Sequence, residues 1–151
     1  MSDELRPMRW WDIEPVMSIE ESVFESTAWS AGQFWGELAH DDRAYVVMDD
    51  DEGVVGYAGL MVRPPTADVQ TIAVAPRARR RGLATAMLRH LLEVAEASGC
   101  REVMLEVRAD SAGAVALYEM HGFEVIARRT SYYGPGLDAL IMRRIRGHRD
   151  R

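Results

Sequence analysis

Cysteine and long hydrophobic runs are both scarce in this sequence, and each shortage excludes a class of protein. Cys100 is the only cysteine, so the chain can form neither an intrachain disulfide nor a zinc site built on a cysteine pair. No stretch reaches the ~18 consecutive apolar residues expected of a membrane-spanning helix. A signal peptide begins with a basic region followed by an apolar region, whereas this sequence has Asp3 and Glu4 ahead of any apolar run. We therefore predict a soluble, cytoplasmic protein without a membrane partner.

Basic residues are also in the minority, with 18 against 24 acidic residues and a formal net charge of -6. This balance repels polyanions, so we expect no direct nucleic-acid partner despite the cluster of Arg77, Arg79, Arg80 and Arg81. Nucleic-acid binding through that cluster would show a steep dependence of affinity on salt. The four histidines lack the spacing of metal ligands, and we expect no metal.

Neither an internal repeat nor a low-complexity linker interrupts the chain, whose 151 residues are 48% hydrophobic. That length and composition suit one domain with its own core. We assign residues 1–145 to a single domain and residues 146–151 to a basic, frayed C-terminal tail. The oligomeric state stays open, with a monomer favoured.

Helical and strand-like periodicities alternate along the chain. A helix is expected over residues 10–24, with Asp12 as its cap, and Ser30 precedes a second helix through residue 38. The other predicted elements are strands over 44–48, 54–62 and 67–74, a helix over 82–98, a strand over 103–108, a short helix capped by Asp110 or Ser111, and strands over 123–129 and 139–145. With a short strand near Leu5, this order favours an α/β or α+β fold with helices on both faces of a sheet.

The segment from Thr71 to Thr85 is the most informative, because a strand, a basic loop and a helix start follow one another within it. Gly82 and Ala84 leave space at the helix N-terminus, where unpaired N–H groups and the positive end of the helix dipole attract phosphate. The nearby arginines offer charge to further phosphates. The alternative is a solvated arginine-rich turn with Gly82 as a flexible junction. The loop lacks the glycine spacing of common nucleotide-binding motifs.

The run Arg79–Ala84 resembles the Gln/Arg-x-x-Gly-x-Gly/Ala signature of the GNAT acetyltransferase superfamily, placed between a strand and a helix as in that superfamily. Further segments resemble, in order, the RimI family of ribosomal-protein alanine N-acetyltransferases. These segments are Leu105–Ala109, Ala116–Glu119, Gly122-Phe123, Tyr132-Tyr133 and Asp138–Met142. The resemblance covers nearly the whole chain, although the first sixty residues match loosely.

The resemblance implies a GNAT fold, in which a mixed, mostly antiparallel sheet is splayed between the strand that ends at Val74 and the strand that carries Glu106. It also implies acetyl-CoA as the cosubstrate, with its thioester between those strands and a backbone N–H near Ala73 or Val74 to stabilise the oxyanion. The residues expected to bind acetyl-CoA are Ile72, Ala73, Val74, Arg79, Arg80, Arg81, Gly82, Leu83, Ala84, Thr85 and Ser111. Ser111 stands where many family members carry asparagine, and its hydroxyl has a shorter reach.

Direct attack on the thioester, without an acyl-enzyme, is the chemistry that the resemblance implies. Glu106 is the expected general base, since a carboxylate in an apolar strand is unfavourable unless hydrated, paired or functional. Tyr118 matches the general acid of the family. The alternatives are an ion pair of Glu106 with Arg108 and a core tyrosine packed on Val115. With a phenol pKa of about 10 and a thiol pKa of about 8.5, proton donation by Tyr118 is slightly uphill.

The expected acceptor is a protein N-terminal α-amine, which the resemblance identifies as an alanine on a ribosomal protein. Its pKa of about 7.7 to 8.0, against about 10.4 for lysine, means that a modest base suffices. Trp29, Tyr132 and Tyr133 are expected to wall the peptide groove, and for Trp29 a hydrophobic staple on the next helix is the alternative. The competing functions are acetylation of a small amine, a polyamine or a lysine side chain, and a non-catalytic acyl-CoA-binding module.

Overall fold

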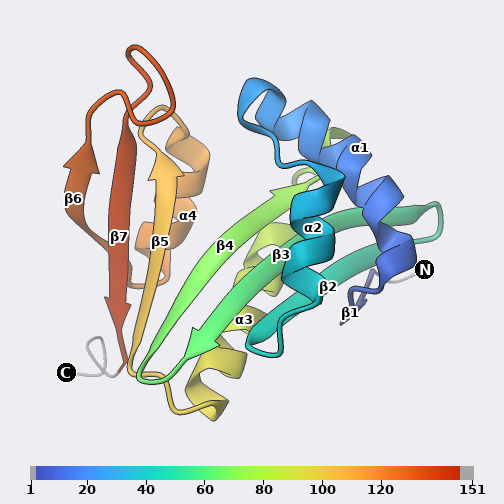
Figure 1. Cartoon of the computed structure of the whole chain (residues 1–151), viewed down its shortest axis with the longest axis horizontal. Coiled ribbons are helices and arrows are strands. Elements are labelled where there is room, and N and C mark those ends of the chain that lie inside the picture. The colour runs from blue at the N-terminus through green and yellow to red at the C-terminus, as the bar shows by residue number, and fades with distance from the viewer. Residues whose placement is uncertain (1–2, 147–151) are drawn as a thin grey trace.

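The computed structural model describes residues 3–146, which form one seven-stranded sheet flanked by four α-helices (Figure 1). The strands are β1 (Glu4–Pro7), β2 (Arg43–Asp50), β3 (Gly53–Arg63), β4 (Thr66–Val74), β5 (Glu102–Arg108), β6 (Glu124–Arg129) and β7 (Ala139–Ile145). The helices are α1 (Ile13–Phe24), α2 (Ala31–Leu38), α3 (Leu83–Ala97) and α4 (Ala112–Met120), with 3-10 turns η1 (Trp10–Asp12), η2 (Glu25–Thr27) and η3 (Pro76–Ala78). The predicted order of elements is confirmed.

The sheet has the strand order β1-β2-β3-β4-β5-β7-β6, and every neighbouring pair is antiparallel except β4 and β5. The parallel pairing joins only residues 66–69 of β4 to residues 102–105 of β5, although β4 continues to Val74 and β5 to Arg108. Figure 1 shows the two strands diverging beyond that point, so that the sheet opens into two halves. The mixed, mostly antiparallel and splayed sheet is therefore confirmed.

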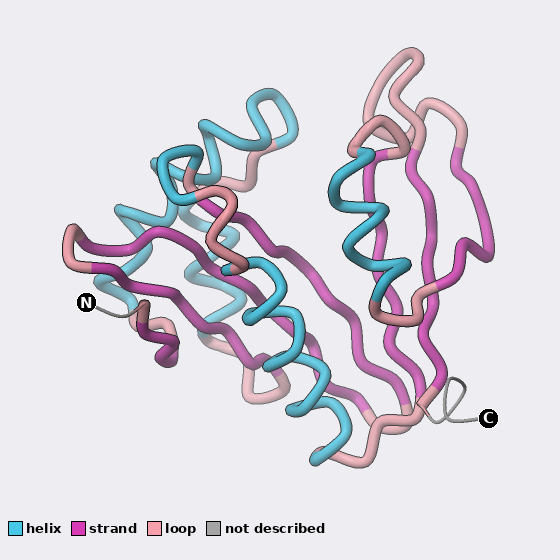
Figure 2. The backbone as a smooth tube through the Cα atoms, turned by 180° about the vertical axis from the view of Figure 1, so that it is seen from behind, coloured by secondary structure: helices cyan, strands magenta, loops and turns pink. Residues whose placement is uncertain are grey.

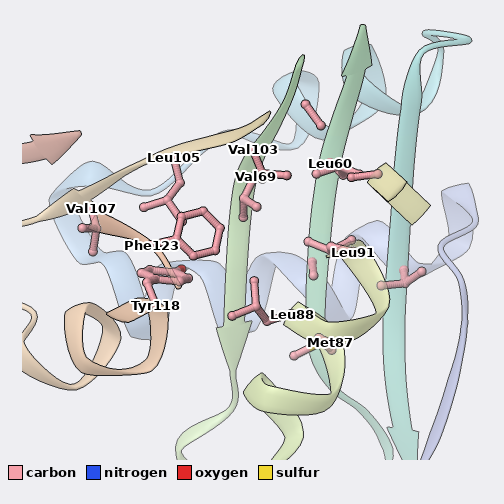
Figure 3. Packing of buried hydrophobic residues seen from close by; sticks show 14 of the residues in the cluster. Leu60, Val69, Met87, Leu88, Leu91, Val103, Leu105, Val107, Tyr118 and Phe123 are labelled. Carbon is pink, nitrogen blue, oxygen red and sulfur yellow. The ribbon is translucent and has the colours of Figure 1, made fainter. Parts of the chain in front are cut away.

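Helices cover both faces of the sheet, as predicted. α1 and α2 lie on one face, where Val16, Phe34 and Tyr57 are fully buried in one hydrophobic cluster. α3 and α4 lie on the other face and are nearer the viewer in Figure 2. Figure 3 shows the cluster on this side, in which Tyr118 of α4 lies beside Phe123. Each half of the sheet is thus covered on this face by one helix, α3 or α4.

Strand β5 shows how the sequence pattern assigns side chains to the two faces. Val103, Leu105 and Val107 belong to the cluster beneath α3 and α4. Because successive side chains of a strand point to opposite faces, Glu106 points to the face of α1 and α2. The buried face of α3 likewise follows the predicted helical spacing. It consists of Leu83, Met87, Leu88, Leu91 and Ala95.

Asp12 does not cap α1 as predicted. It occupies the N-cap position, but its side chain accepts no hydrogen bond from the helix. Its carboxylate is 2% exposed and accepts hydrogen bonds from the Arg6 guanidinium at 2.8 Å and from the Arg9 backbone N–H at 2.8 Å. The competing partner, Arg6, comes from β1, and its position depends on strand pairing that the local pattern does not encode.

Two further predictions concern the ends of elements. Residues 10–24 form the 3-10 turn η1 followed by α1, rather than one continuous helix. Within the predicted tail, residues 147–151 lie outside the described residues, whereas the backbone N–H of Arg146 donates to the Arg101 carbonyl at 2.8 Å. None of the helices within residues 3–146 combines the length and apolar character needed to cross a membrane.

Candidate active site

The loop before α3 leaves the N-terminus of that helix open. Gly82 is the N-cap residue with a φ of 75°, and Arg80 also has a left-handed φ of 67°. No side chain caps the first turn, which contains no acidic residue, and a Cβ added to Gly82 would meet no atom within 4 Å. The first N–H groups of an α-helix have no partner inside the helix, and such groups bind anions when they are accessible.

A cavity of about 570 Å³, here called the phosphate cavity, lies against this helix start. The diverging part of β4 contributes Ile72, Ala73 and Val74, and Ser111 contributes from the N-cap of α4, whose N–H groups its side chain does not cap. The loop and first turn of α3 contribute Arg79, Arg80, Gly82, Leu83, Ala84 and Thr85. The residues predicted to bind acetyl-CoA therefore line one cavity, with the exception of Arg81.

Arg81 pairs instead with acidic residues at the start of the chain and the end of β2. Its Nη1 lies 3.0 Å from Asp50 Oδ2 and 3.7 Å from Asp3 Oδ1, and Arg77 Nη1 lies 2.9 Å from Asp50 Oδ2. The hydrogen bond from Arg77, with further ones from the Glu52 backbone and Arg81, holds the pKa of the Asp50 carboxyl well below its usual range. The loop arginines are thus divided into a pair held by Asp50 and a pair that lines the cavity.

A smaller cavity of about 170 Å³, here called the central cavity, lies at the gap between β4 and β5. Glu106 of β5 and Tyr118 of α4 both line it, so the structure brings the two predicted catalytic residues to one place. Ile72, Ser111 and Tyr118 also line the phosphate cavity. The central cavity therefore adjoins the phosphate cavity at the point where the strands separate.

Glu106 does not form the ion pair with Arg108 that was the structural alternative. Arg108 Nη2 lies 2.8 Å from Asp110 Oδ2. Glu106 Oε1 instead has Arg129 Nη1 at 3.9 Å, and the Glu106 side chain is 36% exposed. At that distance and exposure the attraction is weak, so Glu106 keeps an accessible carboxylate at the mouth of the cavity.

Tyr118 is a packed core residue that also lines the central and phosphate cavities. The residue is 8% exposed, and its ring packs edge-on against Phe123 with 5.8 Å between the ring centroids. Its hydroxyl has no hydrogen-bond partner among residues 3–146. Every fully buried side-chain nitrogen or oxygen atom in those residues does have a hydrogen-bond partner. The hydroxyl must therefore be accessible from the cavities that Tyr118 lines. Burial raises the pKa of Tyr118 to about 12. Proton donation from Tyr118 to a thiolate is therefore more unfavourable than donation from a free phenol.

A third cavity of about 530 Å³, here called the groove, continues from the central cavity on the face of Glu106. Trp29, Glu106 and Tyr133 line both. Tyr132 also lines the groove, is 50% exposed and carries the Arg129 guanidinium 5.0 Å from its ring centroid. The three aromatic residues predicted to wall a substrate groove are thus brought together.

Trp29 forms the hydrophobic staple that was the alternative for this residue, and it also lines the groove. Its ring centroid lies 5.1 Å from that of Phe34 in α2. Between them, the Ser30 hydroxyl oxygen accepts a hydrogen bond from the Gln33 backbone N–H, and the Ser30 backbone N–H donates one to Gln33 Oε1, which is a capping box. The staple fixes the direction in which the chain enters α2, and the same ring then reaches the groove.

Residues 6–123 match the family model described as the acetyltransferase (GNAT) family. The chain belongs to the GNAT family. Among GNAT relatives, the putative ribosomal protein bS18-alanine N-acetyltransferase of Bacillus subtilis is 34% identical over 140 residues, covering 91% of this chain and 92% of that protein. The N-alpha-acetyltransferase RimI of Mycobacterium tuberculosis is 38% identical over 142 residues, covering 90% and 88%.

The chain is also similar to a longer protein and to a solved structure. An uncharacterized protein of Mycobacterium leprae is 38% identical over 139 residues, but this chain spans only 38% of its length. The crystal structure of the ribosomal-protein-S18-alanine N-acetyltransferase from Escherichia coli matches with a TM-score of 0.86 at 28% identity, covering 95% of this chain and 94% of that chain.

Two residues of this GNAT site were missed by sequence reasoning. Glu20 of α1 lines the central cavity and is buried. Its signal was present, because Glu20 follows Val16 by one helical turn and shares the buried face of α1. Arg129 lies on β6, which follows β5 and β7 in the sheet, and this strand order brings its side chain to Glu106 of β5. Strand order cannot be predicted from a local sequence pattern.

Proposed function

We propose that this GNAT protein transfers the acetyl group of acetyl-CoA to the N-terminal α-amine of a protein, with the alanine of a ribosomal protein as the preferred acceptor. The names of the Bacillus subtilis and Escherichia coli proteins support this acceptor, and the name of the Mycobacterium tuberculosis protein supports an α-amine. One observation carries the proposal: the uncapped start of α3 opens on a cavity that leads, between the diverging strands, to Glu106.

The residues of the phosphate cavity suit acetyl-CoA by charge and by shape. The N–H groups of the first turn of α3 would bind one phosphate, and the guanidinium groups of Arg79 and Arg80 would bind others. Residues 72–74 have no described strand partner on the β5 side, so an extended pantetheine can lie along them. The acetyl thioester would then lie in the central cavity, within reach of Tyr118 and Glu106.

Glu106 would act on the acceptor and Tyr118 on the leaving group. Glu106, directly or through water, takes a proton from the substrate ammonium, and the free amine forms a bond to the thioester carbon. When the intermediate collapses, the C–S bond breaks and the sulfur receives a proton from Tyr118. In the same event the second ammonium proton passes through solvent to the Tyr118 oxygen, so the phenol is restored as the sulfur is protonated.

The raised pKa of Tyr118 constrains how this last proton moves. With the pKa of Tyr118 at about 12 and a thiol near about 8.5, full transfer is uphill by roughly 5 kcal/mol. Donation is therefore feasible only when it is coupled to the loss of the second ammonium proton. Before that moment Tyr118 serves as a hydrogen-bond donor to the developing thiolate, which lowers the barrier without a separate phenolate intermediate.

An intact-mass assay tests the proposal with Ala-starting peptides, the same peptides blocked at the N-terminus, lysine-containing peptides and free amines. We expect one acetyl group on the unblocked Ala peptide and none on the blocked one. Glu106→Gln and Tyr118→Phe should each lower kcat by roughly 100-fold or more while acetyl-CoA binding persists. Unchanged turnover in both variants would remove the catalytic assignments, and binding without any acetylated amine would establish the non-catalytic module.

The same spectra separate direct attack from an acyl-enzyme. The chain contains no lysine, so an acetyl group on the enzyme could sit only on its N-terminal amine or a side chain such as Cys100, which is buried. Direct attack predicts an enzyme of unchanged mass during turnover. A transient acetyl adduct that disappears in Cys100→Ser together with activity would contradict it.

A further inference from the structure

Only two acidic side chains are buried within residues 3–146, and one of them, Glu20, lines the central cavity. Glu20 lies on the inner face of α1 and is 2% exposed. Its Oε2 accepts a hydrogen bond from the Trp29 backbone N–H at 2.8 Å, and its Oε1 accepts one from the Tyr57 hydroxyl. One carboxylate thus joins α1 to the loop before α2 and to β3.

Packing alone does not explain a carboxylate at this position. Burial raises the pKa of the Glu20 carboxyl, and the hydrogen bonds from Tyr57 and Trp29 only oppose that shift. No described arginine forms an ion pair with Glu20, and a buried charge without one lowers stability. An apolar side chain beside Val16 and Ile19 would continue the buried face of α1 without this penalty.

One of the two groups that Glu20 holds, Trp29, belongs to the wall of the groove, and the other, Tyr57, lies buried behind it. Trp29 lines both the central cavity and the groove. Its ring packs on Phe34, and Phe34 packs edge-on against Tyr57 with 5.8 Å between centroids. The two hydrogen-bond donors to Glu20 are therefore the two ends of one aromatic row, and the carboxylate ties these ends together.

We propose that Glu20 is a positioning residue for the acceptor, which fixes Trp29, and with it the groove wall, relative to Glu106. Both carboxylate oxygens are already engaged, so Glu20 acts through Trp29 rather than as a second base. The kinetic part of this inference rests on the proposed function. The structural part, the hold on Trp29, does not.

Two substitutions of Glu20 separate positioning from catalysis. Glu20→Gln keeps the network, because its amide oxygen can accept from the Trp29 N–H and its NH₂ can donate to the Tyr57 oxygen. Glu20→Ala removes it, and we expect KM for an Ala-starting peptide to rise about tenfold, as for loss of a buried, charge-assisted hydrogen bond. KM for acetyl-CoA should stay within about twofold, since the phosphate cavity keeps its contacts. Glu21→Ala and Glu21→Gln at the exposed neighbouring position are the matched controls.

Hydrogen exchange provides a readout that needs no acceptor. The Trp29 amide should lose protection in Glu20→Ala and retain it in Glu20→Gln and in both Glu21 variants. If Glu20→Gln loses as much kcat as Glu20→Ala, Glu20 takes part in the chemistry and the positioning role is wrong. If Glu20→Ala changes only the melting temperature, leaving peptide KM and Trp29 exchange intact, Glu20 is merely structural. Should the wild type acetylate no Ala-starting peptide, the proposed function fails, while the exchange comparison still decides whether Glu20 holds Trp29.

Discussion

At the scale of single residues, neighbouring groups decide which chemistry a side chain can offer. Glu106 and Arg108 share one face of β5, yet Asp110 takes the arginine and leaves the glutamate accessible. Tyr118 is fixed by its packing on Phe123, while its hydroxyl stays open to the central cavity. The same burial that holds the ring raises the pKa of the phenol, so position and acidity are coupled in this residue.

The pH dependence of acetylation should reflect that coupling. Because the pKa of Tyr118 is raised to about 12, the phenol keeps its proton as pH rises, and it causes no alkaline loss of activity below about pH 11. The acidic limb should follow the acceptor α-amine, with a pKa of about 7.7 to 8.0, because the proton that Glu106 takes from it must pass on to solvent before the amine attacks. Profiles of kcat/KM against pH for an Ala-starting peptide measure both limbs. An alkaline limb near pH 9 that is absent in Tyr118→Phe would contradict this assignment.

At the scale of elements, the loop between β4 and α3 is organised by an acid that comes from outside it. Asp50, the last residue of β2, holds Arg77 and Arg81, while Arg79 and Arg80 line the phosphate cavity. The start of α3 adds N–H groups that no side chain caps. Four similar residues, close together in sequence, are therefore sorted into two roles by one carboxylate.

This sorting predicts different kinetic effects for equivalent substitutions in the loop. Arg80→Ala and Arg79→Ala should each raise KM for acetyl-CoA by about tenfold, since each would remove a proposed charge-assisted contact to phosphate. Arg77→Ala should raise it by no more than about threefold, because its guanidinium is paired and partly exposed. Peptide KM should not change in any of the three. Initial rates at varied acetyl-CoA measure this, and an Arg77→Ala effect equal to that of Arg80→Ala would refute the division.

At the scale of the whole molecule, the divergence of β4 and β5 makes one passage through the sheet. The phosphate cavity includes residues of α3 and α4, and the groove lies on the side of Glu106. The central cavity shares residues with both. The proposed donor and acceptor would therefore approach the central cavity from opposite sides, and neither would have to pass the other.

The free energy of unfolding should be lowered by the buried Glu20 carboxylate. Its pKa is raised in the folded chain, so the folded state binds the proton more tightly than the unfolded state, and stability falls as pH rises through that raised value. Glu20→Gln cannot titrate. We expect wild type and Glu20→Gln to differ least below the unfolded pKa of about 4.3 and the variant to gain relative stability toward neutral pH. Urea unfolding at acidic and neutral pH measures this difference, and a constant difference at all pH values would show that Glu20 is not responsible.

Most of this architecture could be predicted from sequence, because local periodicity sets it. The buried face of α3 and the alternation in β5 follow from spacing alone, and the ordered motifs singled out Glu106, Tyr118 and the loop before α3 as candidate site residues. The features that the sequence did not predict depend on partners distant in sequence. Asp12 forms an ion pair with Arg6, and Arg81 forms one with Asp50. Glu20 is recognised as a candidate site residue only from its contacts with β3 and the loop before α2.

The short parallel pairing of β4 with β5 has a consequence for how the folded chain responds to its ligand. Residues 70–74 present a strand edge that the protein itself does not complete. An extended molecule that forms hydrogen bonds with this edge would pair with β4 as an added strand and join the two halves of the sheet. At a concentration of about 100 times Kd it would add about 2.7 kcal/mol to the free energy of unfolding. Resistance to heat is therefore a gauge of how fully the gap is occupied.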